Sequence, residues 1–337
     1  MGATGASGDH IEYFLEDITY QGKSPRTQEA YSRVLREDQR YLHSRGLTLE
    51  TANHRDCMAY IHQLRGDVGQ STVATYASYL HRFYDYMTRV DVFEDNPMAI
   101  VLEEIDESID TDPARRDITV SEMRSFVGDI THPLDRAVVM VLLKTGMRAG
   151  ELCNIDTRDL HLPAPVVELS HRPRLDGRPS SLYVDDTPTD SKLYNGEHRT
   201  ASNKRKRATT IPVDDELAAV LNRWLAVRPD PASRADPLFV STGKEWGKRL
   251  TPDMVHHIVT SHARDAGWYR EGGGPEENVT PHYFRHFFTT HLRDRTGDRG
   301  VVKYLRGDVA SDVIDTYTHD WGSMVCDVYE ENIYRLL

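Results

Sequence analysis

Residues 134–152, LDRAVVMVLLKTGMRAGEL, run from a strongly apolar segment into a charged turn. The segment from Leu134 to Met147 is apolar on nearly every side, which is typical of a helix buried in the core of a domain. Arg148 follows in a glycine-flanked turn, with Glu151 three residues further on. An isolated cation beside a core is costly, so Arg148 needs Glu151 or an anionic ligand as its partner. The pattern therefore allows either a structural ion pair or an anion site.

A second polar cluster lies in residues 280–293, where Thr280 can cap a helix and Pro281 fits its first position. His282 and Arg285 follow three residues apart and share one face of this helix. Nearby phenylalanines form an adjoining apolar stripe that would bury the helix and hold that polar face still. A histidine and an arginine near a helix N-terminus suit an anion, although an ordinary charged surface helix fits the same pattern.

A third feature is the basic run RTASNKRKR at residues 199–207, which holds five cations in a chain of net charge -12. It precedes the strand-like segment 208–213, ATTIPV. Cations on a β-hairpin can follow a phosphate backbone, so the run favours nucleic-acid binding. A solvated loop is the alternative.

The remaining pattern predicts a mainly α protein with a small β-sheet. Apolar residues recur at helical spacing from about residue 11 to 92, and strand-like periodicity appears between 162 and 213, notably at 166–169 and 181–184. Six carboxylates between Glu103 and Asp112 indicate a solvated linker. We expect four parts: a flexible N-terminus 1–9, a helical domain 10–100, an acidic linker 101–117 and a mixed α/β domain 118–337.

Composition narrows the class further. The 337 residues contain no apolar run long enough to span a bilayer and no signal pattern at the N-terminus, which predicts a cytoplasmic protein without a membrane partner. Three separated cysteines, Cys57, Cys153 and Cys326, are expected to be reduced and mostly buried. No Cys/His or carboxylate cluster has metal-ligand spacing, so neither a metal nor another cofactor is expected.

A fourth motif, DTYTH at residues 315–319, completes a set. In chain order the set is TGMRAGEL, a lysine before TTIPV, HYFRH and DTYTH, and it resembles the tyrosine recombinase (phage integrase) family. The segments SPRTQEAYSRVLREDQRYL, QSTVATYASYLHRFYDYM and EDNP resemble the helical core-binding, SAM-like domain of that family. The resemblance covers about residues 10–330. Together the four motifs are far more specific than any one of them.

The resemblance implies a site-specific recombinase that needs neither a metal nor ATP. Tyr317 would attack the scissile phosphate and form a 3′-phosphotyrosyl intermediate, which stores the energy of the broken bond. Arg148 and Arg285 would hold the non-bridging oxygens, and His282 would assist proton transfer or donate a hydrogen bond to the same phosphate. The partners implied are double-stranded DNA sites, a homo-tetramer on paired sites and accessory DNA-bending proteins.

The general acid of the family is a lysine eight residues before the proline that closes its strand. Counting back from Pro212 gives Lys204, with Lys206 as the second candidate because the hairpin register is open. The sequence departs from the family at Asp308, where a histidine or tryptophan is usual. A carboxylate there would be repelled by a phosphodiester unless it is protonated, turned away, or paired with Arg306 or Arg285. Its role stays open at this stage.

Other family-like residues receive structural roles. His286 and His319 match common family positions and are expected to be structural, while Tyr329 and Tyr334 are expected to pack in the C-terminal tail, which could instead dock on a neighbouring subunit. The product of the reaction could be integration or excision of a mobile element, or resolution of replicon dimers. The acidic composition is compatible with a salt-rich cytoplasm, such as that of a halophilic archaeon or its virus or plasmid.

Two other functions fit parts of the pattern. A catalytically inactive DNA-binding protein of the same family would explain Asp308, but the retained arginines, lysine, histidine and tyrosine argue against it. A topoisomerase would use the same tyrosine chemistry, but the integrase-like helical domain argues against it.

Overall fold

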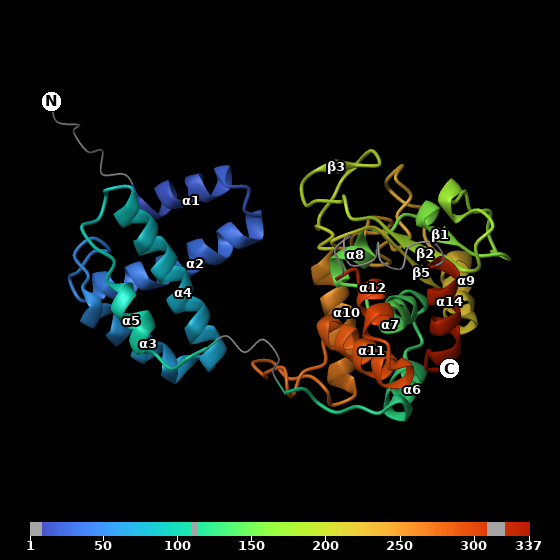
Figure 1. Ribbon diagram of the computed structural model, residues 1–337. Helices are drawn as coiled ribbons and strands as arrows, with labels where there is room; N and C mark the ends of the chain where they lie inside the picture. Colours follow the sequence, from blue (N-terminus) through green and yellow to red (C-terminus); the bar gives the residue numbers. More distant parts are fainter. Residues whose placement is uncertain (1–8, 109–113, 309–320) are drawn as a thin grey trace. The chain divides into compact units, whose positions relative to one another are not determined.

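The computed structural model describes residues 9–108, 114–308 and 321–337. The chain divides into two compact units, Met1–Pro113 and Ala114–Leu337, which are described separately (Figure 1). We call them the N-terminal unit and the C-terminal unit.

The N-terminal unit is helical throughout its described part. Its helices are α1 (His10–Tyr20), α2 (Pro25–Ser44), α3 (His54–Asp67), α4 (Gln70–Arg89) and α5 (Met98–Glu104). Helix α2 has a clear N-terminal cap, because Ser24 accepts a hydrogen bond from the backbone N–H of Thr27 and Pro25 begins the helix. The aromatic side chains of Phe83 and Tyr84 in α4 belong to the core and are fully buried.

One carboxylate lies inside this core. Asp38 of α2 is only 1% exposed, and burial raises its pKa to about 7, although the nearby hydroxyl of Tyr84 opposes that shift. Cys57 is a free, buried thiol beside it, and burial raises its pKa as well. The N-terminal unit therefore contains an acid that titrates near neutral pH.

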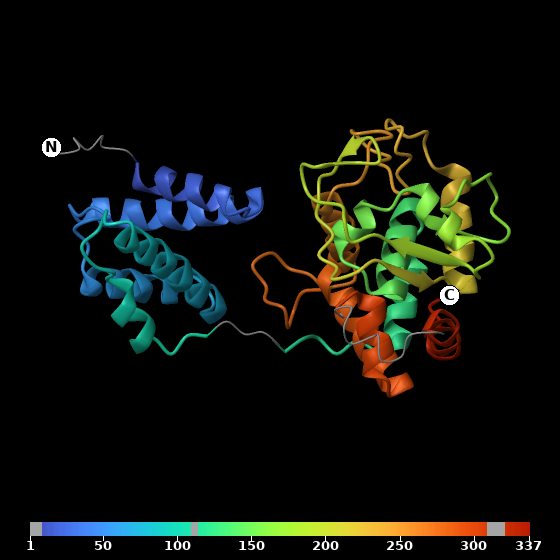
Figure 2. The ribbon, with the colours of Figure 1, turned by 45° about the horizontal axis from the view of Figure 1, so that its top comes forward.

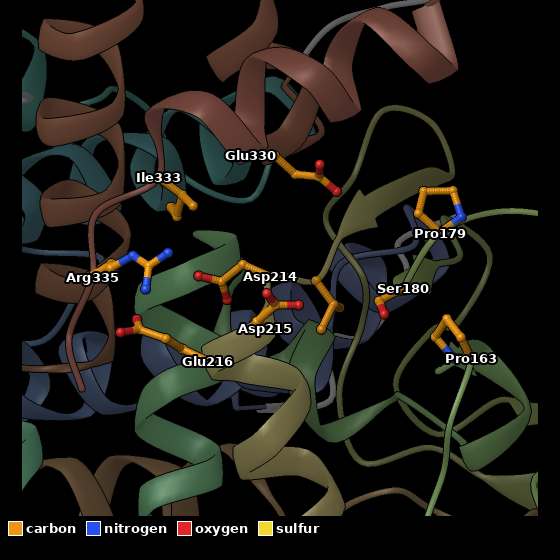
Figure 3. A pocket seen from close by; sticks show the side chains of 10 residues that line it. Pro163, Pro179, Ser180, Asp214, Asp215, Glu216, Glu330, Ile333 and Arg335 are labelled. Atoms are coloured by element: carbon orange, nitrogen blue, oxygen red, sulfur yellow. The ribbon is translucent and has the colours of Figure 1, made fainter.

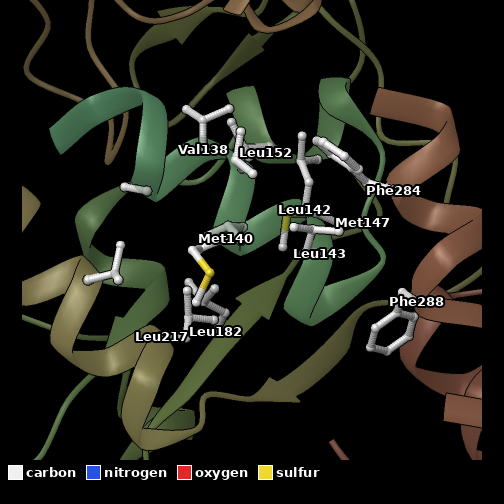
Figure 4. Close-up of a cluster of buried hydrophobic side chains, with 14 of the residues drawn as sticks. Val138, Met140, Leu142, Leu143, Met147, Leu152, Leu182, Leu217, Phe284 and Phe288 are labelled. Atoms are coloured by element: carbon white, nitrogen blue, oxygen red, sulfur yellow. The ribbon is translucent and has the colours of Figure 1, made fainter. Parts of the chain in front are cut away.

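The C-terminal unit surrounds helix α7 (Pro133–Thr145), which is buried on nearly every side, as the sequence predicts. Its apolar residues meet Leu182 of the sheet, Leu217 of α9 (Asp215–Val227) and Phe284 of α11 (Pro281–Thr296) (Figure 4). The other helices are α6 (Val120–Asp129), α8 (Ala149–Cys153), α10 (Pro252–Asp265), α12 (Arg299–Arg306) and α14 (Trp321–Asn332).

The strands of this unit are short. β1 (Leu160–His161), β2 (Ser181–Val184) and β5 (Thr209–Pro212) form an antiparallel sheet in the order β1-β2-β5, while β3 (Leu193–Tyr194) pairs with β4 (Glu197–His198) (Figure 2). Two short 3₁₀ helices cover Thr157–Asp159 and Pro173–Leu175. A mainly α fold with a small sheet is thus confirmed.

The prediction of a strand at residues 166–169 is wrong. No strand pairs with that segment in the described part of the chain, and Val166 is 58% exposed. The backbone N–H of Val166 donates instead to the Asn222 side chain, at 3.0 Å. Two prolines, Pro163 and Pro165, precede it and have no N–H to offer a neighbouring strand, so its β-branched residues form a loop.

The C-terminal segment closes the core around a buried cation. Lys144 of α7 is fully buried, and its Nζ donates to Asp214 Oδ2 at 2.5 Å, to Glu216 Oε2 at 2.7 Å and to the carbonyl of Tyr334 at 2.6 Å. The hydroxyl of Tyr329 donates to the carbonyl of Lys144 at 2.9 Å. Tyr329 and Tyr334 are therefore packing residues, as expected, and here the tail packs on its own unit (α14, red in Figure 1).

Candidate active site

Arg148 is positioned by the turn that ends helix α7. Gly146 adopts a left-handed conformation with φ of 60°, and a Cβ there would overlap the ring of Phe288. The backbone N–H of Arg148 donates to Glu151 Oε2 at 2.9 Å, and its Nη1 donates to Oε1 at 3.1 Å. Glu151 is fully buried and pairs with Arg148, which is one of the two partners that the sequence left open. Arg148 stays one-third exposed and still has donors for an anion.

Arg285 lies on the inner side of helix α11 and is 2% exposed. Its Nη1 donates to the carbonyl of Gly146 at 2.5 Å, and its Nη2 donates to the carbonyl of Arg306 at 3.1 Å. Burial, followed by the charges of Arg148 and Arg306, lowers the pKa of Arg285 to about 10. The guanidinium therefore remains charged at neutral pH, and the ends of α7 and α12 hold it in place.

Asp308 lies between these two arginines. Arg148 Nη2 donates to its Oδ1 at 3.0 Å, Arg285 Nη2 lies 2.8 Å from Oδ1 and 3.0 Å from Oδ2, and Arg306 Nε lies 3.0 Å from Oδ2. Burial raises the pKa of Asp308, but the positive charges of Arg285, Arg306 and Arg148 outweigh that effect and hold the pKa below its ordinary value. The carboxylate is thus ionised and paired, one of the arrangements the sequence left open.

His282 is exposed one turn before Arg285 on the same helix. Desolvation and the nearby cations, of which Arg115 and Arg285 contribute most, lower its pKa from the ordinary histidine value. The imidazole is therefore neutral at pH 7 and able to accept a proton. His286 is half-buried, and its Nε2 lies 3.4 Å from the hydroxyl of Thr290. Tyr317 and His319 lie outside the described residues.

The sequence suggested that the basic run lies on a β-hairpin. In the structure only Arg199 does so, because its backbone pairs with Lys192 and Ser191 across the β3–β4 hairpin, and the rest of the run forms a loop before β5. Two of its five cations are buried and paired: Arg199 with Asp156 at 2.8 Å, and Arg205 with Glu151 at 3.2 Å. Lys204 and Lys206 are exposed. The backbone carbonyl of Lys204 lies 3.4 Å from Arg148 Nη1, which places this lysine beside the arginine site.

Arg205 is a site residue that sequence reasoning missed. Its side chain is fully buried, and its Nη1 donates to the carbonyl of Leu305 at 3.0 Å. The sequence of the basic run does not indicate that Arg205 is buried, because the neighbouring lysines are equally basic. Its burial depends on Glu151 and on the end of α12, which are distant in the sequence.

The charges of this cluster do not cancel. Four guanidiniums, of Arg148, Arg205, Arg285 and Arg306, face the two carboxylates of Glu151 and Asp308, which leaves two positive charges in excess. Guanidinium forks of this kind fit the oxygens of a phosphate. The cluster is therefore suited to a phosphodiester.

A separate cavity lies away from this cluster. It has a volume of about 340 Å³ and lies beside the C-terminal segment, between Asp214, Asp215 and Glu216 of the α9 start and Glu330 and Arg335 (Figure 3). None of the arginines of the cluster lines it. In the described part of the chain no three metal-ligating side chains come together, and no helix there could cross a membrane.

Comparisons with known families match both units. The phage integrase family matches residues 118–322, and the N-terminal SAM-like domain of phage integrases matches residues 11–90. Tyrosine recombinase XerC of Alcanivorax borkumensis is 27% identical, over 95% of this chain and 92% of that protein. Tyrosine recombinase XerD of Listeria monocytogenes serotype 4b is 26% identical, over 96% of this chain and 98% of that protein.

Solved structures share the fold. The Tn1549 transposon integrase in complex with a circular intermediate DNA is similar with a TM-score of 0.64 and 18% identity, over 93% of this chain and 96% of that chain. A lambda integrase dimer bound to a COC′ core site is similar with a TM-score of 0.63 and 15% identity, over 93% of this chain and 77% of that chain.

Fold, motifs and relatives together define a tyrosine-type site-specific recombinase, as the sequence predicted. The chain belongs to the phage integrase family, whose model covers more than half of its length.

Proposed function

We propose that this recombinase cleaves and rejoins double-stranded DNA through a covalent bond between Tyr317 and a 3′-phosphate. The observation that supports the proposal is the meeting of Arg148 and Arg285 on the two oxygens of a single carboxylate, at 2.8–3.0 Å. Two non-bridging oxygens of a phosphate offer the same acceptors. Two guanidiniums held in this way stabilise the charge that develops on a phosphoryl group in the transition state.

The proposed reaction is an in-line displacement at phosphorus. The Tyr317 oxygen forms a bond to phosphorus while the bond from phosphorus to the 5′-oxygen breaks. Lys204 gives a proton to the departing oxygen, and neutral His282 assists by accepting the tyrosine proton or by donating a hydrogen bond to the phosphate. Rejoining is the reverse, with a 5′-hydroxyl of another strand attacking the phosphotyrosine. No external energy source is needed, because the number of phosphoester bonds is unchanged.

The proposed substrate is a pair of DNA sites joined by four copies of the chain in the cytoplasm, with accessory bending proteins as further partners. Supporting this, one structure of similar fold is a lambda integrase tetramer bound to a Holliday junction, with a TM-score of 0.61. The relatives named XerC and XerD match across both units. Exchange of strands between two sites would integrate or excise a mobile element, or resolve replicon dimers.

The test is covalent capture. The wild-type chain is incubated with DNA that carries the flanking sequence of its element and a nick near the cleavage point, and adducts are resolved on a denaturing gel. We expect an adduct with wild type, also in excess EDTA, and none with Tyr317→Phe, which should bind the same DNA with unchanged affinity. A normal adduct yield from Tyr317→Phe, or cleavage that needs a divalent ion, would overturn the proposal.

A further inference from the structure

Asp308 lies at the point where the reaction needs an anion site. It directly follows Gly307, which ends helix α12 in a left-handed conformation with φ of 70°. Its side chain is 27% exposed, so solvent and ligands reach it. Each of three arginines contributes a nitrogen within 3.0 Å of its oxygens.

This geometry is that of a bound anion. Oδ1 is shared by Arg148 and Arg285, and Oδ2 is shared by Arg285 and Arg306. A phosphodiester presents two charged oxygens on one atom in the same manner, and it seeks the same guanidinium donors. Asp308 and a scissile phosphate would therefore compete for one set of nitrogens.

We propose that Asp308 is a positioning residue that occupies the arginine site as an internal anion in the DNA-free protein and gives way to the scissile phosphate when DNA binds. The contacts of Asp308 with Arg148, Arg285 and Arg306 support this inference. That the incoming group is a scissile phosphate rests on the proposed function.

The internal anion offsets the mutual repulsion of the arginines. Three guanidiniums that converge without an anion would repel one another, and Arg148 and Arg306, both about one-third exposed, would turn towards water. The Asp308 carboxylate holds them at the spacing that a phosphate needs. It also keeps small anions out of the site, because they must displace a partner that is tethered to the protein.

Withdrawal of Asp308 is compatible with the local structure. No donor other than the three arginines makes a hydrogen bond or ion pair to its carboxylate among the described residues. Its own backbone N–H donates to the carbonyl of Lys303 at 3.1 Å, so rotation of the side chain leaves the end of α12 in place.

The test measures binding of inorganic phosphate to the full chain without DNA. Thermal unfolding is followed as phosphate replaces chloride at constant ionic strength, in wild type, in Asp308→Asn and in Asp294→Asn. Asp294 is a matched control, because it is an exposed carboxylate of the same unit that pairs with its neighbour Arg293. If Asp308→Asn fails to fold, Asp308→His, the residue type usual in the family, takes its place.

We expect millimolar phosphate to raise the midpoint of the Asp308 variant by about 2–4 °C and to leave wild type and Asp294→Asn unchanged. An additional Arg148→Ala substitution should abolish the gain. Equal stabilisation of wild type and the Asp308 variant, or no stabilisation of any variant, would overturn the proposal.

A second measurement separates this proposal from the proposed function. The phosphate titration is repeated in a Tyr317→Phe background, where no chemistry is possible. If phosphate binds only after removal of the Asp308 carboxylate while covalent capture fails in every variant, the internal anion stands and the nucleophile assignment falls. If covalent capture succeeds and phosphate binds equally well with and without the Asp308 carboxylate, the nucleophile assignment stands and the internal anion falls.

Discussion

Arg205 fixes the end of helix α12 from a position 100 residues earlier in the chain, because its Nη1 donates to the carbonyl of Leu305 at 3.0 Å. The side chain also approaches Gly307 so closely that a Cβ there would lie 2.7 Å from Arg205 Nη1. On its other side Arg205 Nη2 lies 3.2 Å from Glu151, the partner of Arg148. The buried Arg205 thus connects the loop of Lys204 and Lys206, the Arg148 motif and the turn before Asp308.

We predict that Arg205→Met lowers the cleavage rate by about 10- to 100-fold while DNA binding changes little. The substitution keeps the volume but leaves Glu151 with one cation fewer, so the free energy of unfolding should also fall by about 2–3 kcal/mol. Rates on a nicked site and denaturant unfolding measure the two effects. Arg207→Met is the control, because Arg207 is partly exposed and rests on the Tyr304 ring, and it should keep near-normal cleavage. Equal loss in both variants would refute a special role for Arg205.

A second prediction chooses between the two lysines. Lys204→Ala should slow cleavage of an ordinary site by about two to four orders of magnitude, because the alkoxide leaving group loses its proton donor. It should cleave a 5′-phosphorothiolate site at close to the wild-type rate, since sulfur leaves without a proton. Lys206→Ala should mainly weaken binding and reduce its salt dependence by about one phosphate contact.

The sulfur substrate also shows how the lysine prediction could fail. Rescue of Lys206→Ala alone would make Lys206 the general acid. Rescue of neither variant would move the proton donor elsewhere, and His282 would be tested next.

The third prediction concerns Asp38 and pH. Its folded pKa of about 7 lies well above the ordinary value, so the protonated acid is the form that the core accepts. The contribution to stability is complete below about pH 4 and is lost as pH rises through 7, at a total cost of up to about 4 kcal/mol.

Asp38→Asn should therefore stabilise the protein at pH 8 and flatten the pH dependence between pH 4 and 8. Denaturant unfolding of the full chain, followed at the transition of the N-terminal unit, measures this. Glu29→Gln is the control, because it removes a carboxylate from the exposed face of the same helix α2 and should leave the slope intact. A slope unchanged by Asp38→Asn would contradict the prediction.

The fourth prediction tests the buried cation of the C-terminal unit. Lys144→Met should destabilise this unit by about 3 kcal/mol, because Asp214 and Glu216 keep their charges without their shared partner. Tyr329→Phe removes one hydrogen bond to the Lys144 carbonyl and should cost only about 1 kcal/mol. Both values come from denaturant unfolding; similar losses in the two variants would show that the ion pairs contribute little beyond packing.

Much of the fold could be predicted from local patterns. Ser24 and Thr119 cap their helices as their neighbours in sequence indicate, and the apolar run before Arg148 is a buried helix. The prediction failed where an element depends on a partner that is distant in the sequence. The segment 166–169 has the residues of a strand, but a strand needs a neighbour, and no local pattern supplies one.

The candidate site shows the same division. The arginine motifs meet, as the family resemblance implies, because each ends or lines a helix whose packing is encoded locally. The alternation of buried Arg205 with exposed Lys204 and Lys206 could not be predicted, since it depends on Glu151 and on the end of α12. The sequence left several roles open for Asp308. Its contacts with three arginines show that the carboxylate is ionised and paired.

The Lys144 centre also bears on how the chain folds during synthesis. The central helix α7 is made early, yet among the described residues the partners of its buried ammonium come much later: Asp214, Glu216 and the carbonyl of Tyr334, which lies 190 residues further on. Until residue 334 has left the ribosome, the C-terminal unit cannot complete its core, whereas the N-terminal unit can fold long before. A nascent chain attached to the ribosome would therefore hold a folded helical unit before the core of the C-terminal unit is complete.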